Sequence, residues 1–105
     1  MSRELKSVIS GNISGLNRMY SLEFRQSVEK AFQKLAKRDP ALLERIHRKI
    51  QEICQNPQVY KNLRAPMQHL KRVHIDKRFV LVFSVDENTK TVLIEDFDHH
   101  DRIYL

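Results

Sequence analysis

Residues 79–85, with the sequence FVLVFSV, decide how the rest of the chain is organised. Apolar side chains occupy both the odd and the even positions of this segment. Successive side chains of a strand point to opposite faces, so both faces of this strand need apolar cover. The segment is therefore predicted to be the central strand of a sheet.

The segments on either side of residues 79–85 are predicted to be strands as well. In residues 69–75, Val73 and Ile75 alternate with polar side chains, which is typical of a strand with one buried face. After the turn-forming sequence DENTK, residues 91–97 form a third apolar-rich segment. The three segments are expected to form an antiparallel meander.

A short strand and two helices are predicted to precede the meander. Apolar and polar side chains alternate in residues 19–24, and apolar side chains recur at helical spacing in residues 25–38. A second helix is expected between Asp39, a good N-cap residue followed by proline, and the Asn-Pro pair at residues 56–57. The order β-α-α-β-β-β predicts an α+β fold, a small antiparallel sheet with both helices packed on one face. The other face is left available for ligands.

Length and composition favour one folded domain. The chain has 105 residues, 41% hydrophobic and 30% charged, which leaves little room for a second core. Residues 1–18 contain both glycines, Gly11 and Gly15, and are predicted to be an N-terminal extension, either a short helix or loose, before a domain at residues 19–105. The single cysteine, Cys54, lies on an apolar helical stripe and is expected to be buried rather than to act as a nucleophile.

The sequence shows neither a membrane span nor a secretory signal. No apolar run approaches the ~18 residues of a membrane span. The N-terminus lacks the apolar stretch of a secretory signal. We therefore expect a cytoplasmic protein with no membrane partner.

The charges are segregated along the chain. The formal net charge is +6, and residues 25–78 hold fourteen basic and five acidic residues. Residues 86–101 hold six acidic residues and one lysine. A basic surface suits a polyanion such as nucleic acid, because neutralised phosphates release condensed counterions. A solvated basic surface without a ligand explains the same composition.

Four residues suggest a ribonuclease-like set of groups. If Val73 faces the helices, Arg72 and His74 face the open side of the sheet, and His100 and Tyr104 lie near the chain end. Metal-free cleavage of RNA needs a base for the 2′-OH, cations for the phosphorane and an acid for the leaving 5′-oxygen. Each residue also has a structural explanation: a charge balanced by neighbours, a surface histidine, or a tyrosine that anchors the chain end.

A metal site is the alternative for the acidic and histidine-rich end of the chain. Histidine and carboxylate ligands suit zinc or manganese, and candidates are Asp96, Asp98, His99, His100 and Asp101. Strand alternation would place Asp98 and His100 on one side and His99 and Asp101 on the other. We therefore expect no complete metal site and no metal in the reaction.

Several short motifs resemble those of one toxin family. They are YSLEF at residues 20–24, NP at 56–57, LRA at 63–65, RVHI at 72–75, FVLVF at 79–83 and HHDRIY at 99–104. In this order and spacing they resemble the RelE/ParE superfamily of prokaryotic toxin–antitoxin modules, from about residue 19 to residue 104. The resemblance implies an antiparallel sheet cupped by two N-terminal helices, in agreement with the pattern above.

The resemblance also implies a function. It suggests a metal-independent, ribosome-dependent mRNA endonuclease that inhibits translation, needs no cofactor, is a monomer alone and is silenced by an acidic antitoxin. Histidine-bearing members of the YafQ type use histidines as acid–base groups, so His100 is expected to be the general base or acid and His74 its partner. The other expected site residues are Arg72, Arg64, Lys71 and Arg78 as phosphate contacts and Tyr104 as the residue that orients the substrate.

Three positions depart from the common pattern of the superfamily, and one of them is Ala65, which replaces the glycine that follows the Leu-Arg pair in members. Val80 stands where members commonly have an arginine, and His100 stands at the usual arginine of the terminal motif. Two alternatives therefore stay open, a ParE-like toxin that blocks DNA gyrase by binding and a catalytically silent protein of RelE fold. Gyrase inhibition without RNA cleavage would select the ParE-like alternative.

Overall fold

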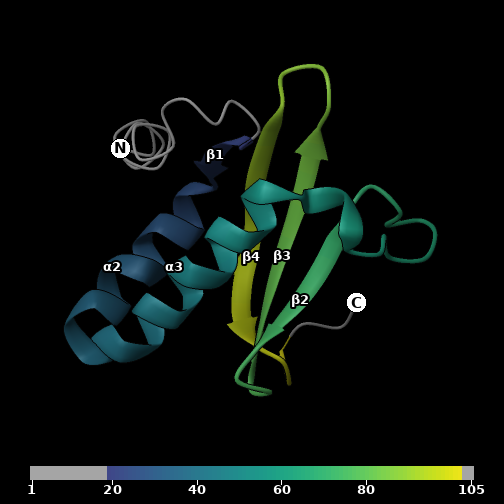
Figure 1. The fold of residues 1–105 in the computed structure, drawn as a ribbon. Helices are drawn as coiled ribbons and strands as arrows, with labels where there is room; N and C mark the ends of the chain where they lie inside the picture. The colour runs from purple at the N-terminus through teal and green to yellow at the C-terminus, as the bar shows by residue number, and fades with distance from the viewer. Residues whose placement is uncertain (1–18, 103–105) are drawn as a thin grey trace.

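A computed structural model describes residues 19–102 and gives the predicted order of elements, with the strands and helices arranged as in Figure 1. The elements are β1 (Ser21–Phe24), α2 (Gln26–Arg38), α3 (Pro40–Gln55), the short 3₁₀ helix η1 (Pro57–Val59), β2 (Lys71–Ile75), β3 (Phe79–Asp86) and β4 (Thr91–His99). The α+β fold is confirmed. Only η1 was not expected from the sequence, because a single 3₁₀ turn leaves no periodic pattern.

The four strands form one sheet in the order β1-β4-β3-β2. The predicted meander is confirmed, because β3 pairs antiparallel with both β2 and β4 and occupies a central position. The first strand makes the sheet mixed, since β1 pairs with β4 in parallel, with Leu22 opposite Val92. Alternation shows which side chains are buried but not the direction of a strand, so the sequence pattern could not reveal this pairing.

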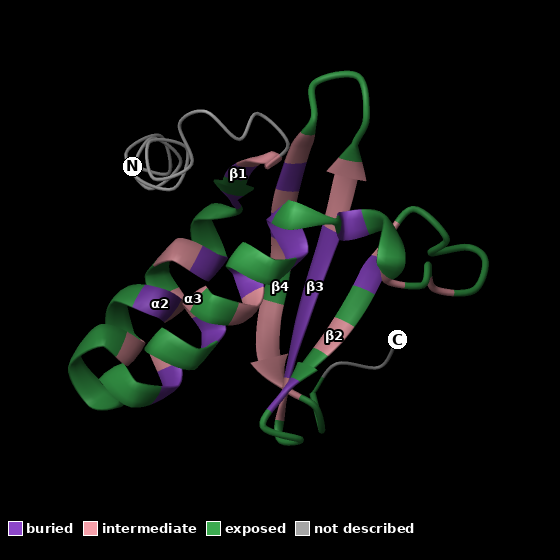
Figure 2. Cartoon of the chain, in the orientation of Figure 1, coloured by how far each residue is buried: buried purple, intermediate pink, exposed green. Residues whose placement is uncertain are grey.

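Both helices pack on one face of the sheet, as expected (Figure 2). Each helix contributes one apolar stripe because its buried residues recur every three or four positions. Phe83 of β3 is fully buried at the centre of the core. The other core residues are Leu22, Phe24, Val28, Phe32, Leu42, Ile46, Ile50, Ile53, Cys54, Ile75, Leu81, Val92 and Ile94.

Asp39 forms the joint between the two helices. Its backbone N–H donates to the Leu35 carbonyl at 2.8 Å and closes α2. Its side chain accepts a hydrogen bond from the Leu42 N–H at 3.1 Å and caps α3, whose first residue is Pro40. The predicted N-cap is therefore confirmed, and it explains how two helices follow each other with one residue between them.

Two further sequence-based expectations concern Cys54 and membrane spans. Cys54 is buried, and burial raises the pKa of its thiol to about 12, as expected for a structural cysteine. None of the helices within residues 19–102 is long and apolar enough to span a bilayer. The predicted extension, residues 1–18, lies outside the described part of the chain.

Candidate functional site

The face of the sheet opposite α2 and α3, called the uncovered face below, carries the first two candidate residues. Arg72 and His74 of β2 are exposed, whereas Ile75 joins the core on the helix side. Arg72 lies opposite Val82 and His74 lies opposite Val80 in the pairing of β2 with β3. The predicted alternation of β2 is therefore confirmed.

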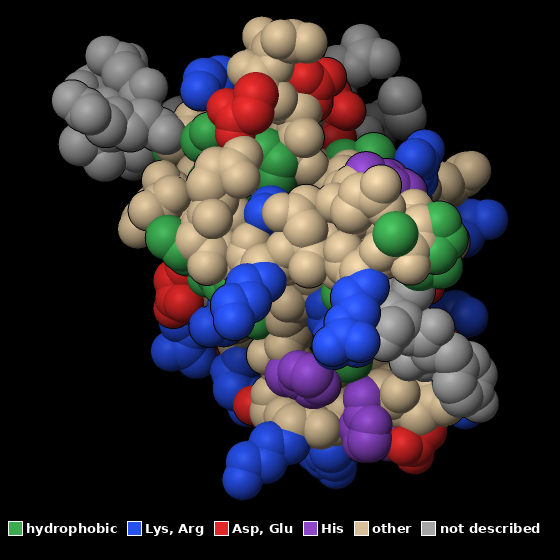
Figure 3. All heavy atoms as spheres, turned by 90° about the vertical axis from the view of Figure 1, so that its right-hand side faces the viewer, with side chains coloured by type: hydrophobic (Ala, Val, Ile, Leu, Met, Phe, Trp, Pro, Cys, Tyr) green, Lys and Arg blue, Asp and Glu red, His purple; other side chains and the backbone are tan. Residues whose placement is uncertain are grey.

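A hollow lies beside Arg72 at the edge of the uncovered face. It has a volume of about 720 Å³ and is lined by Lys61, Asn62, Leu63, Arg64, Ala65, Pro66, Met67 and Arg72. We call it the basic hollow, because three of its lining residues are cations and none is acidic. Figure 3, which faces β2 and the loop before it, shows Lys and Arg side chains spread over this side of the molecule. The hollow is suited to phosphate groups, and the sequence pattern had pointed only to Arg64 and Arg72.

Lys71 does not take part in this site. It is 4% exposed, and its Nζ donates to the Tyr60 carbonyl at 2.6 Å and to Asn62 Oδ1 at 2.9 Å. Burial lowers the pKa of the Lys71 ammonium, while the Glu87 carboxylate acts in the opposite direction. The expected phosphate contact is not supported, because alternation puts residue 71 on the same side as residues 73 and 75. The sequence already indicated this orientation, because residue 71 alternates with residues 72 and 74 along the predicted strand.

Asn62 extends the anchor that Lys71 provides. Its side-chain amide donates to the Gln68 carbonyl at 2.6 Å, and its backbone forms a bridge with Lys71. Lys71 and Asn62 together therefore hold the loop that contains Arg64. The buried lysine supports the wall of the basic hollow from behind.

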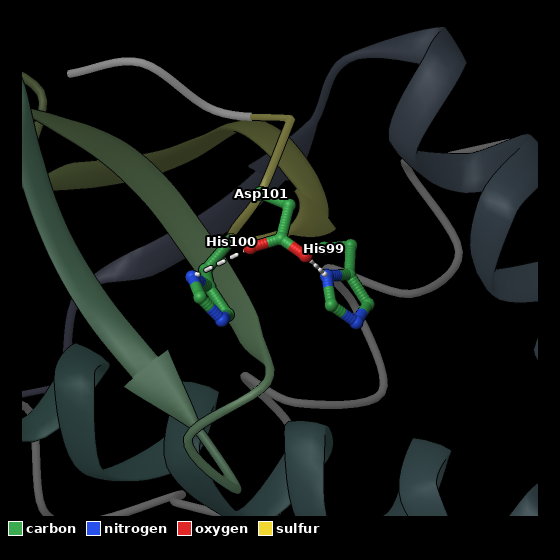
Figure 4. Close-up of side chains that lie close together, drawn as sticks. All are labelled: His99, His100 and Asp101. Carbon is green, nitrogen blue, oxygen red and sulfur yellow. Dashed lines mark ion pairs between the residues drawn. The ribbon is translucent and has the colours of Figure 1, made fainter.

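The turn after β4 brings together His99, His100 and Asp101, called the histidine turn below (Figure 4). The Nδ1 atom of His99 lies 3.5 Å from one Asp101 carboxylate oxygen, and Nδ1 of His100 lies 3.4 Å from the other. The two imidazole rings are stacked, with centroids 5.4 Å apart. The expectation that alternation separates His99 from His100 is wrong, because β4 ends at His99 and the chain turns there.

Backbone contacts place the histidine turn at the end of the sheet where β2 turns into β3. The His100 N–H donates to the Arg78 carbonyl at 2.8 Å. Arg78 lies in the β2–β3 turn, with its guanidinium 5.8 Å from the centre of the Phe79 ring. His74 lies on β2 just before the same turn. His74, Arg78 and His100 therefore share one end of the sheet, while Tyr104 lies outside the described residues.

The β4 side of the uncovered face is acidic. Val82 lies opposite Asp96 and Val80 lies opposite Asp98, so the two valines separate these carboxylates from Arg72 and His74. Two strand spacings amount to roughly 10 Å between the Cα atoms of β2 and β4. Phosphates are attracted to the β2 side and repelled from the β4 side.

Glu95 adds a third carboxylate to the β4 side. The register between β3 and β4 shifts at Val82 and Phe83, and the shift skips Glu95. Glu95 accepts hydrogen bonds from Ser84 Oγ at 2.6 Å and from Arg25 Nε at 3.0 Å. The alternation of residues along a strand does not show where the register shifts, so the position of Glu95 could not be predicted from the sequence. The uncovered face thus has a basic half and an acidic half.

The arrangement has the parts needed for chemistry on a phosphodiester. Two exposed imidazoles, His74 and His100, are groups of the kind that serves as a general acid or base, and Arg72 and Arg64 offer planar donors to phosphate oxygens. The charge difference across the face gives a polyanion one preferred path, along β2 and past the basic hollow.

A protein-family model and two proteins of similar sequence match most of this chain. Residues 19–104 match the family described as the ParE toxin of the type II toxin–antitoxin system, parDE. A Methanocaldococcus jannaschii protein named "Putative toxin RelE4" is 60% identical over 86 residues, which cover 82% of this chain and 92% of that protein. An uncharacterized protein of Methanosarcina mazei is 58% identical over 86 residues, which cover 82% of this chain and 100% of that protein.

Solved structures share the fold. A chain in the toxin–antitoxin complex RelBE2 from Mycobacterium tuberculosis matches with a TM-score of 0.66 and 21% identity, over 80% of this chain and 94% of that one. The isolated E. coli RelE toxin matches with a TM-score of 0.64 and 20% identity, over 80% of this chain and 87% of that one. The family match and the 60% identical relative both span most of the chain. The chain therefore belongs to the RelE/ParE superfamily of toxins from type II toxin–antitoxin systems.

Proposed function

We propose that this toxin is a metal-independent mRNA endonuclease that acts on the ribosome and thereby inhibits translation. The observation that carries the proposal is the placement of Arg72 and His74 on the uncovered face, beside a hollow lined by Lys61 and Arg64. A phosphate backbone bound there lies next to an imidazole. Dependence on the ribosome is inferred from family membership.

In the proposed reaction, one imidazole accepts a proton and the other donates one. One imidazole, that of His100 or His74, removes the proton from the ribose 2′-OH, and the O2′–P bond forms as the P–O5′ bond breaks. The other imidazole gives a proton to the leaving 5′-oxygen. Arg72 stabilises the charge that builds up on the phosphorane. The products carry a 2′,3′-cyclic phosphate and a 5′-hydroxyl group.

Other residues are proposed to position the RNA. Arg64 in the basic hollow and Arg78 beside His100 are proposed phosphate contacts. Tyr104 is proposed to orient the substrate, on the basis of its place in the terminal motif. Lys71 is left out, because its ammonium is used inside the protein.

Cleavage of a translated mRNA in a purified translation system tests the proposal. Wild type is compared with His74→Ala, His100→Ala and Tyr104→Phe, and with His69→Ala as a matched control at an exposed histidine that does not line the basic hollow. Wild type and the control are expected to cut, and the two site histidine variants to cut far more slowly. End-group analysis should find a cyclic phosphate at a magnesium level that keeps ribosomes intact. Absence of cleavage by wild type would refute the proposal.

We propose an acidic antitoxin as the partner of the toxin. The outer surface of α2 presents Lys30, Lys34 and Lys37 in one shallow depression, and the basic hollow offers further cations. An acidic amphipathic segment that covers either surface would be steered by these charges. The association rate should fall steeply as salt rises from low to physiological ionic strength. A rate insensitive to salt would contradict this proposal.

Gyrase inhibition is the second candidate, because the matching family is described as the ParE toxin. Val80 also stands where members of the superfamily commonly have an arginine. A supercoiling assay with purified gyrase distinguishes the two functions. Inhibition of gyrase by a toxin that leaves translated mRNA intact would favour binding over cleavage.

A further inference from the structure

The histidine turn has three metal-ligating side chains in three consecutive residues. One ligand atom from each of His99, His100 and Asp101 can be chosen so that all three lie within 4.8 Å of one another. We propose that these residues bind one Zn²⁺ ion, and that the bound ion switches off RNA cleavage. The switch rests on the function proposed above, because His100 would be both a zinc ligand and a proton carrier. The zinc site itself does not depend on the proposed function.

The donor set is of the type that zinc prefers. Two imidazole nitrogens and one carboxylate oxygen are ordinary zinc ligands, and three protein ligands leave a fourth position for water. Both Nδ1 atoms face the carboxylate of Asp101, one toward each oxygen (Figure 4). The side chains are 38%, 46% and 72% exposed for His99, His100 and Asp101, so an ion reaches them without any opening of the core.

The surrounding structure holds the turn in place. The His99 ring packs edge-on against Phe79 with centroids 5.4 Å apart, which limits its rotation. The His100 N–H is bonded to Arg78, and the Arg102 N–H donates to the His99 carbonyl at 2.9 Å. Small movements of exposed side chains are therefore enough to bring the donors to the ~2.0–2.2 Å that zinc requires.

The charges near the turn are compatible with a cation. Arg102 lies 3.6 Å from Asp98, and the Arg78 guanidinium lies over the Phe79 ring, so both are engaged with groups other than Asp101. Without zinc, the two imidazoles flank one carboxylate.

Calorimetric titration of the full chain with Zn²⁺ tests the site itself. Wild type and the control His69→Ala are expected to bind one ion per chain, with Co²⁺ giving the absorption of a tetrahedral site. His99→Ala and Asp101→Asn should each bind about tenfold or more weakly. Asp101→Asn removes only a charge at an exposed position, so it answers the question if His99→Ala fails to fold. Equal affinity in wild type and both site variants would overturn the proposal.

Cleavage assays with and without Zn²⁺ test the switch. Zinc should inhibit wild type and His69→Ala, and a chelator that prefers zinc to magnesium should restore cleavage. His99→Ala should keep cleaving at a zinc concentration that stops wild type. Equal inhibition of wild type and His99→Ala would overturn the switch, because zinc would then act elsewhere. If wild type cleaves nothing without zinc, the proposed function fails, while the calorimetric result still decides whether the site exists.

Discussion

Lys71 and Arg72 are adjacent residues of the same charge on one strand, yet they lie on opposite faces of the sheet. Lys71 points to the covered side of the sheet and is held by Tyr60 and Asn62. Arg72 points to the uncovered face and lines the basic hollow. The period of two along a strand is what separates them.

The covered and uncovered faces of β2 therefore serve different purposes. Side chains on the covered face, Lys71 among them, hold the sheet, the helices and the loop before β2 together. On the uncovered face of β2, Arg72 and His74 meet solvent and, in our proposal, RNA. Substitutions on one face should therefore change stability, and substitutions on the other should change activity.

The largest effect is expected from substitution of a proposed catalytic residue. His100→Ala should lower the rate of mRNA cleavage by ~10²–10⁴, the contribution of a positioned proton-transfer group. The free energy of unfolding should change by less than about 0.5 kcal/mol, as for most surface positions. Cleavage rates and denaturant unfolding of the same preparation measure both. Full activity in His100→Ala would show that the histidine is wrongly assigned.

The next effect concerns the covered face. Lys71→Ala leaves the Tyr60 carbonyl and Asn62 Oδ1 without their donor and should lower the free energy of unfolding by about 1–3 kcal/mol. Arg72→Ala is the matched control, with an expected change below about 1 kcal/mol and a larger loss of cleavage. Urea unfolding of both variants provides the measurement. If Arg72→Ala proves the less stable of the two, the division of β2 into two faces is wrong.

The sequence predicted the covered face better than the uncovered one. Apolar periodicity identified α2, α3 and the central position of β3, because burial of apolar side chains is what forms them. Arg72 and His74 were found by the same alternation. The stacking of His99 against His100 was not predicted, since a strand pattern does not show where the strand ends. The basic hollow depends on how a loop without periodicity folds, so no pattern in the sequence could outline it.

Glu87 is exposed, and yet its contacts are structural. It accepts hydrogen bonds from Lys90 Nζ, from the Gln58 amide and from the Tyr20 hydroxyl, which tie the β3–β4 turn to η1 and to the residue before β1. These donors, Lys90 first, lower the pKa of the Glu87 carboxyl to about 2. Exposure alone therefore does not identify a residue of the functional site.

The lowered pKa predicts how stability depends on pH. A carboxyl whose pKa is lower in the folded chain stabilises it fully above the ordinary value of 4.5, and this contribution is lost as pH falls from 4.5 toward 2. Glu87→Gln should thus be less stable than wild type at pH 7, and the difference should shrink through that acid range. Urea midpoints at pH 7, 4.5 and 3 measure it. A difference that stays constant with pH would mean that the charge of Glu87 contributes nothing.

The smallest effect is expected from removal of residues 1–18. Gly11 and Gly15 interrupt the apolar pattern of that segment, and the match to the ParE toxin family begins at residue 19. A chain that begins at Met19 should therefore unfold cooperatively near the midpoint of the full chain and should cleave RNA at the same rate. A loss above about 3 kcal/mol, which is typical of deleted core contacts, would show that the side chains between Leu5 and Leu16 pack into the domain. Contacts of residues 1–18 would then contribute to the stability of the domain, in addition to the contacts on the covered face of the sheet.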